Sequence, residues 1–191
     1  MSRFSKKELR KEYKAKRQEL SDNEREKLSE QIAEKLLTEF DWKDHFVHVF
    51  IPIARFNEAD TWPLIRKFWT MAGIRVSTSV TDFEGDTLRH FEIFDTTRFK
   101  KSSWGIDEPE DGEEIDPKEI NRVLIPLLAF DKQGYRVGYG KGFYDKFLSM
   151  CNPNTERIGI SFFPPIDQIE DVADHDVKLT SCVTPDGIFR F

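Results

Sequence analysis

The stretch that decides the fold runs from residue 123 to residue 148 and reads VLIPLLAFDKQGYRVGYGKGFYDKFL. It opens with an apolar run, Val123 to Phe130, which is long enough to form one strand buried on both faces. Three glycines at alternate positions follow this run: Gly138, Gly140 and Gly142. The next residues, 144–148, predict a helix that begins directly behind the glycines. A strand, a glycine-rich loop and a helix N-terminus together predict a phosphate-binding loop.

The chemistry of this loop also suits an anion. Glycines leave backbone N–H groups with no side chain in front of them, so the backbone can fold around an anion. Arg136 and Lys141 add two cations to the same loop. The pattern differs from a Walker A loop because Gly142, and not Ser or Thr, follows the lysine, and its G-x-G-x-G spacing differs from the Rossmann fingerprint. A glycine-rich turn with a solvated lysine is the alternative interpretation.

Composition restricts the class of protein. The chain has 191 residues, 34% of them charged, and a formal net charge of −6, which fits one globular domain over residues 1–191. The negative charge argues against a dedicated nucleic-acid binder, and no apolar run reaches membrane-spanning length. Only Cys151 and Cys182 are present, without metal-type spacing. A reducing cytoplasm is therefore the expected location.

The N-terminal segment is strongly basic within this acidic chain. Ser5-Lys6-Lys7-Glu8 has the form of a capping box, so a helix is expected to begin near Lys6. Up to Arg17 the segment carries far more basic than acidic residues. The helix either presents its positive potential to a ligand or is a solvated face.

Strands and helices alternate along the rest of the chain. Strands are expected at 46–53, 74–80, 87–94, 157–163 and 183–184, and a second capping box at 21–24 precedes an amphipathic helix. This alternation predicts an α/β sandwich with a largely parallel sheet.

Two polar segments are candidates for a site in such a fold. Loops after strand C-terminal ends are where open α/β sheets place ligand groups, and Glu58-Ala59-Asp60-Thr61 follows the first expected strand. Near the C-terminus, Asp174-His175-Asp176 puts two carboxylates around a histidine. That trio fits either a divalent-ion site or a surface turn.

Several motifs together resemble the 5-formyltetrahydrofolate cyclo-ligase family. The string R-V-G-Y-G-K-G-F-Y-D at 136–145, after a strand that ends in A-F-D, closely resembles the family signature. K-x-x-L-R at 6–10, E-x-D-T at 58–61, G-I-x-E-P at 105–109 and Asp176 match further family positions. The resemblance covers nearly the whole chain. It implies the three-layer α/β fold, with a mostly parallel sheet, shared with ribose-phosphate isomerase and CoA-transferase-like proteins.

The resemblance also implies an activity. Members of the family close 5-formyltetrahydrofolate to 5,10-methenyltetrahydrofolate through a phosphorylated formyl intermediate, and convert ATP to ADP and phosphate. Catalytic roles are implied for Lys141 and Arg136, which would neutralise the triphosphate, and Mg²⁺ binding for Asp145 and Asp176. A small-molecule substrate and a monomer are expected, with no nucleic-acid or membrane partner.

The binding residues implied by the resemblance fall into two groups. The nucleotide is expected to contact Lys6, Lys7, Arg10, Arg136, Val137, Gly138, Tyr139, Gly140, Lys141, Gly142, Phe143 and Tyr144. The folate is expected to contact Ile53, Glu58, Tyr139, Gly140, Lys141, Gly142 and Phe143.

The chain departs from the family pattern in a few places. Phe143 stands where many members have Tyr, and Val137 where Leu is usual. Two other functions stay open. One is an enzyme of the same fold that acts on a sugar phosphate or an acyl-CoA without ATP. The other is an RNA-binding module that uses the basic N-terminal helix, against which the acidic total and the lack of an aromatic–basic platform count.

Overall fold

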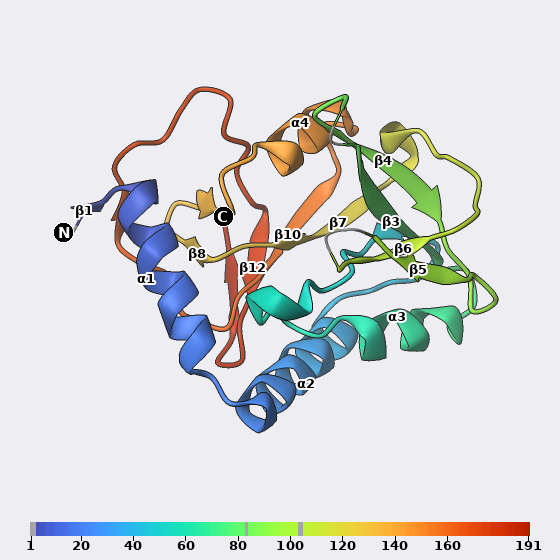
Figure 1. Ribbon diagram of the computed structural model, residues 1–191, viewed down its shortest axis with the longest axis horizontal. Coiled ribbons are helices and arrows are strands. Elements are labelled where there is room, and N and C mark those ends of the chain that lie inside the picture. Colours follow the sequence, from blue (N-terminus) through green and yellow to red (C-terminus); the bar gives the residue numbers. More distant parts are fainter. Residues whose placement is uncertain (1–2, 83, 103–104) are drawn as a thin grey trace.

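A seven-stranded, mostly parallel sheet forms the middle layer of the protein (Figure 1). The structure, a computed structural model, describes residues 3–82, 84–102 and 105–191. The strand order is β13-β12-β10-β7-β2-β3-β4, with parallel pairing from β12 to β3 and antiparallel pairing at both edges. These strands are β2 (Phe46–His48), β3 (Arg75–Asp82), β4 (Thr87–Glu92), β7 (Arg122–Pro126), β10 (Glu156–Ile160), β12 (Ser181–Val183) and β13 (Ile188–Arg190).

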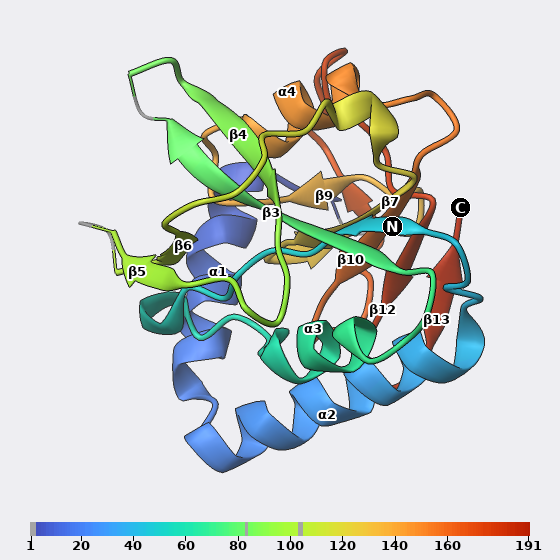
Figure 2. The same ribbon diagram turned by 90° about the vertical axis from the view of Figure 1, so that its right-hand side faces the viewer.

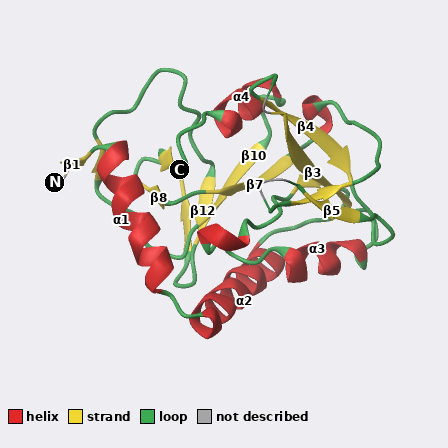
Figure 3. Ribbon diagram, viewed as in Figure 1, coloured by secondary structure: helices red, strands yellow, loops and turns green. Residues whose placement is uncertain are grey.

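Helices cover both faces of this sheet. Helices α2 (Asp22–Glu39) and α3 (Trp62–Trp69) lie on one face, and α4 (Phe143–Met150) lies on the other (Figure 2). The same layers stand out in Figure 3, where helices are red and strands are yellow. The predicted three-layer α/β sandwich with a mostly parallel sheet is therefore confirmed.

Strand β7 shows why a continuous apolar run suits the centre of the sheet. Leu124 packs in the core cluster beneath α2 and α3, whereas Val123 and Ile125 pack in the cluster beneath α4. All three side chains are completely buried. Successive side chains of a strand point to opposite faces, so a strand covered on both sides needs apolar residues at every position.

The predicted single strand from Val123 to Phe130 is wrong in its extent. Strand β7 ends at Pro126, and Ala129–Phe130 forms a separate strand, β8, that pairs antiparallel with β9 (Arg136–Val137). Proline has no N–H for a sheet ladder, which suits it to the end of a strand. The break turns the chain out of the main sheet and places β9 just before the glycine loop.

Other strand boundaries also differ from the prediction. The first expected strand, 46–53, keeps only Phe46–His48 as β2, because the chain then leaves the sheet for the loop that holds Glu58. The expected strands 74–80, 87–94, 157–163 and 183–184 correspond to β3, β4, β10 and β12 with shifted ends. The short elements β1 (Arg3–Phe4), β5 (Phe99–Lys101), β6 (Asp107–Pro109), β11 (Gln168–Ile169), η1 (Ala54–Phe56) and η2 (Pro117–Glu119) were not predicted.

Helix α1 (Lys6–Glu19) stands apart from the other helices, at the left end of the molecule in Figure 1. Both predicted capping boxes are present; in the first, the Ser5 N–H donates to Glu8 over 3.0 Å, while the Glu8 N–H donates to Ser5 Oγ. Leu9 and Tyr13 pack α1 against β8, β9 and β11. This docking brings the basic N-terminal helix beside the glycine loop.

Two buried histidines lie beneath α4. His48 of β2 and His90 of β4 are 0% and 2% exposed, with ring centroids 5.5 Å apart, and His90 stacks on Phe147 of α4. Within the described ranges, none of their ring nitrogens has a hydrogen-bond partner. Burial lowers the pKa of both histidines, that of His90 to about 4, and the neighbouring His90 further lowers the pKa of His48.

No helix in residues 3–82, 84–102 and 105–191 combines the length and apolar content that crossing a membrane requires.

Candidate active site

A large cavity opens where the parallel strands β2 and β7 end. It has a volume of about 1250 Å³ and is walled by α1, the loop after β2, the glycine loop, the start of α4 and residues 174–177. Ligands of open α/β sheets bind outside the carboxyl ends of the strands, which is where this cavity lies. The two polar segments singled out in the sequence, at Glu58 and at Asp176, both contribute to its wall.

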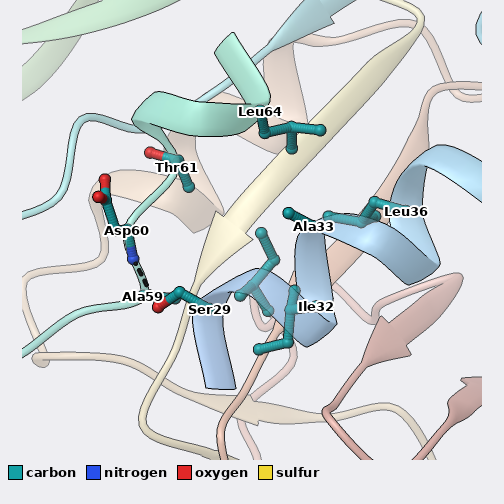
Figure 4. A pocket seen from close by; sticks show the side chains of 9 residues that line it. Ser29, Ile32, Ala33, Leu36, Ala59, Asp60, Thr61 and Leu64 are labelled. Carbon is teal, nitrogen blue, oxygen red and sulfur yellow. Dashed lines mark hydrogen bonds between the residues drawn. The ribbon is translucent and has the colours of Figure 1, made fainter. Parts of the chain in front are cut away.

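A second hollow lies between α2 and α3 and belongs to the core (Figure 4). It measures about 10 Å³, no more than the space of a single water molecule. Apolar side chains such as Ile32 and Leu64 line it, and at its edge the Asp60 N–H donates to Ser29 Oγ over 3.0 Å. It has no room for a ligand.

The glycine loop adopts a backbone that side chains would oppose. Gly140 and Gly142 have φ of +95° and +73°, in the left-handed region that favours glycine. A Cβ on Gly140 would lie 3.1 Å from the Arg10 guanidinium, whose Nε donates to the Gly138 carbonyl over 3.1 Å. Gly142 is also the N-cap of α4 and supplies no capping side chain. The first turn of α4 therefore faces the cavity as a site for an anion.

The two predicted catalytic cations have different surroundings. Lys141 is exposed at the cavity wall, and it forms no ion pair with any residue that the structure describes. The Arg136 side chain is 6% exposed, pairs with Asp145 over 2.7 Å and donates to the Val177 carbonyl. Burial lowers the pKa of Arg136, although Asp145 opposes this change by favouring the charged guanidinium. Lys141 is thus available to a ligand, while Arg136 ties α4 to the segment at Val177.

Asp145 and Asp176 come together across the cavity wall. Oδ1 of Asp145 accepts the Val177 N–H over 3.2 Å, and Oδ2 of Asp176 accepts the Ala173 N–H over 2.7 Å as well as the Lys6 ammonium. Burial acts to raise the pKa of Asp176, but these two hydrogen bonds outweigh it, so the pKa lies below its usual value. Asp176 is therefore an anion at neutral pH.

The donor set at this point suits a hard cation that takes further ligands from a substrate. One oxygen of each carboxylate, Oδ2 of Asp145 and Oδ1 of Asp176, has no hydrogen bond to the described residues. Mg²⁺ is usually held by one or two carboxylates plus water and phosphate oxygens. In the described ranges no group of three or more His, Cys, Asp and Glu side chains is placed to hold a metal alone. The described residues therefore form no complete protein cage for a metal, and a Mg²⁺ shared by Asp145 and Asp176 stays a prediction.

Glu58 forms a buried polar part of the cavity wall, next to Tyr139 of the glycine loop. It is 4% exposed; Oε2 accepts the Ile53 N–H and Oε1 accepts the Tyr139 hydroxyl, each over 2.8 Å. Burial raises the pKa of Glu58, against the charge of Arg17 and these hydrogen bonds. The Tyr139 ring stacks on Phe56 with centroids 4.6 Å apart. The pair gives the cavity an aromatic surface next to a carboxylate.

Most of the other residues predicted to bind ligands also reach the cavity. Lys6, Arg10, Ile53, Phe143 and Tyr144 line it. Lys7 is exposed outside this lining, and Val137 is buried in the apolar cluster beneath α1. Asp174 and His175 of the C-terminal trio also line the wall. Among the residues that the sequence prediction did not include are Lys14, Arg55, Phe56 and Ser79 in the wall, and Arg17 behind it. Arg17 lies two helical turns after Arg10, and that spacing was the available signal.

Comparison with known proteins assigns the family. The model of the 5-formyltetrahydrofolate cyclo-ligase family matches residues 2–185. The chain belongs to this family. The expectation of a cyclo-ligase family member, and hence of a ligase, is confirmed.

Individual relatives agree with this assignment. The 5-formyltetrahydrofolate cyclo-ligase of Escherichia coli is 29% identical over 180 residues, covering 92% of this chain and 97% of that protein. The Mycoplasma genitalium protein of the same name is 38% identical over 74 residues, 38% of this chain and 45% of its own length. The solved 5,10-methenyltetrahydrofolate synthetase of Aquifex aeolicus is 28% identical, with a TM-score of 0.78, over 97% of this chain and 92% of that one.

Proposed function

We propose that this cyclo-ligase family member closes 5-formyltetrahydrofolate to 5,10-methenyltetrahydrofolate and converts ATP to ADP and phosphate. The observation that supports the proposal is that one cavity contains both an anion-binding loop and a buried carboxylate beside an aromatic stack. The cavity wall contains the glycine loop with Lys141, and next to it the buried Glu58, which is hydrogen-bonded to Tyr139 of the same loop beside the Tyr139–Phe56 stack. At about 1250 Å³, the cavity exceeds the roughly 300–1,000 Å³ of a pocket for one small molecule. Two ligands can therefore meet inside it.

The glycine-loop wall is suited to the triphosphate. The first turn of α4 offers backbone N–H groups, Lys141 offers a free ammonium, and Arg10 stands over Gly140. Phosphoryl transfer needs mainly positioning and charge neutralisation, which these groups supply. Asp145 and Asp176 would hold Mg²⁺, which when bound neutralises charge on phosphate oxygens.

The Glu58 wall is suited to the folate. The carboxylate keeps lone pairs free beyond its bonds to Ile53 and Tyr139, so it can accept N–H donors of the pterin. Tyr139 and Phe56 offer ring faces to a flat heterocycle. These contacts orient the formyl group toward the glycine loop.

The reaction then runs in two balanced steps. The formyl oxygen attacks the terminal phosphorus of ATP, which forms a P–O bond and releases ADP. The neighbouring folate nitrogen attacks the activated formyl carbon, the C–O bond breaks, and the oxygen leaves with the phosphate while the nitrogen loses its proton. The protein residues hold the two ligands in line and balance the charge that moves between them.

The direct test is absorbance growth of the methenyl product from 5-formyltetrahydrofolate, with and without Mg-ATP. Product formation that requires both ATP and Mg²⁺ supports the proposal. No product with Mg-ATP, or equal product without it, refutes it. A monomer acting in a reducing cytoplasm is part of the same proposal, and sedimentation velocity tests the monomer.

A further inference from the structure

Arg17 is buried behind the Glu58 wall and takes no part in the chemistry above. It lies in the last turn of α1 and is 3% exposed. Its Nη1 donates to the Tyr139 hydroxyl over 2.9 Å, and its Nη2 donates to the Leu127 carbonyl. The Nε–H is buried and has no partner among the described residues. A guanidinium in this position costs free energy, because it is desolvated and one of its donors is unpaired.

The direction of each hydrogen bond around Tyr139 follows from Arg17. A guanidinium can only donate, so the Tyr139 oxygen accepts from Arg17 and its own proton goes to Glu58 Oε1, 2.8 Å away. The Ile53 N–H occupies the other oxygen of the same carboxylate. Glu58 is thus held at both oxygens as an acceptor, and its remaining lone pairs are left for a ligand.

Arg17 also acts on the charge of Glu58. Burial favours the neutral acid, whereas Arg17, the Ile53 N–H and the Tyr139 hydroxyl favour the carboxylate. Tyr144 of α4 is a further titratable group near Glu58, and burial together with the Glu58 charge raises its pKa, so it stays a neutral phenol. Arg17 is therefore the positive charge set against the buried carboxylate.

We propose that Arg17 is a positioning residue for the folate: it orients the Tyr139 hydroxyl and, through it, keeps Glu58 ionised and aimed at the N–H donors of the pterin. This inference rests on the proposed function, because it assigns the folate to the Glu58 wall. The competing role is purely structural, since the bond to Leu127 would by itself tie α1 to the turn between β7 and β8.

Arg17→Met removes both the charge and the forked donors. Arg17→Lys keeps the charge but replaces the two separate nitrogens that bond Tyr139 and Leu127 with a single ammonium. Arg122→Met is the matched control, because Arg122 is also buried, pairs with Glu156 and donates to Asp41, but lies outside the cavity lining. Initial rates with each substrate varied in turn, measured over a range of pH, separate the two roles.

The positioning role predicts an effect specific to the folate. In Arg17→Met, kcat/KM for 5-formyltetrahydrofolate falls about tenfold or more, while KM for ATP changes less than about twofold. The acid limb of the folate kcat/KM profile moves up by about one pH unit or more, because an adjacent arginine lowers a carboxyl pKa by about 1–3. Arg17→Lys keeps the position of the acid limb but still raises the folate KM. Arg122→Met changes stability and leaves both profiles alone.

Other results overturn the inference. Equal losses for ATP and folate, or an unmoved acid limb in a folded Arg17→Met protein, assign Arg17 to structure alone. If Arg17→Met does not fold, a wild-type folate KM in Arg17→Lys has the same meaning. Infrared titration of the Glu58 carboxyl band, identified with Glu58→Gln, needs no turnover. It therefore tests Arg17 even if the unaltered protein makes no methenyl product, and an unchanged Glu58 titration in Arg17→Met refutes the role.

Discussion

Mild acid should destabilise this protein through the histidine pair beneath α4. His48 and His90 are buried and neutral in the folded state, and the pKa of each lies below its ordinary value, at about 4 for His90. In the unfolded chain both return to about 6.5. The unfolded state therefore binds more protons as the pH falls below about 6.5. The contribution of the two neutral histidines to the free energy of unfolding is complete above that pH, and it is lost progressively as the pH drops toward the folded pKa values.

The size of the loss follows from the same linkage. When the pH falls from 7 to 5.5, a histidine that stays neutral in the fold but has a pKa of about 6.5 in the unfolded chain lowers the free energy of unfolding by about 1.2 kcal/mol. The pair together costs about 2.5 kcal/mol, a large share of the roughly 5–15 kcal/mol that stabilises a typical domain. Protonating one ring inside the fold would disfavour protonating the other, which keeps both neutral in this interval.

The assay is urea unfolding followed by tryptophan fluorescence, for the unaltered protein and for His48→Leu/His90→Leu, at several pH values. All other titrating groups are shared, so the difference between the two free energies isolates the pair. We expect the double variant to gain about 2.5 kcal/mol relative to the unaltered protein between pH 7 and pH 5.5. Two parallel stability curves would refute the reasoning, because they would mean that the histidines are already protonated or paired in the fold.

Three further predictions concern the cavity. Lys141→Ala should lower turnover about a hundredfold, because it removes roughly 3 kcal/mol of charge stabilisation in the transition state. The urea midpoint should not change, since the Lys141 side chain is exposed. Near-native turnover would mean that Lys141 is only a solvated surface residue. Asp145→Asn and Asp176→Asn should each weaken the Mg²⁺ dependence of the rate. The double variant should be little worse than the poorer single variant, because the two carboxylates act on one ion. Additive losses with an unchanged Mg²⁺ midpoint would contradict a shared ion. Gly140→Ala should lower the free energy of unfolding by about 1–3 kcal/mol, because Gly140 has a left-handed φ and its new Cβ would contact Arg10. Gly138→Ala is the control and should cost little, since open space surrounds the position of its Cβ. Equal losses in urea unfolding would count against the loop geometry.

Local patterns in the sequence predicted the parts of the site that depend on local chemistry. The glycine spacing identified the loop, and the capping box identified the start of α1. The polar tetrad after the first strand located Glu58 at the cavity wall. Each of these features depends on neighbouring residues, which a pattern can represent.

Features that depend on distant residues were beyond these patterns. The apolar run at 123–130 shows no internal change of composition, and only the pairing of residues 129–130 with 136–137 separates it into two strands. A basic helix likewise shows no difference between Lys7, which stays exposed, and Arg17, which is buried against Tyr139. Whether a cation is buried depends on the residues that pack over it, and Arg17 is covered by Tyr139, which lies 122 positions later in the chain.

The docking of α1 sets the order in which the cavity can be completed during synthesis. Strand β1 pairs with β11, Arg10 reaches Gly138 across 128 positions, and Lys6 reaches Asp176 across 170. Helix α1 therefore gains these partners only after residues 138, 168–169 and 176 have also left the ribosome. Contacts of such large sequence separation form late because the intervening chain must first be ordered. Until then α1 is an exposed basic helix on a growing chain, and the part of the cavity wall that Lys6 and Asp176 form together is incomplete.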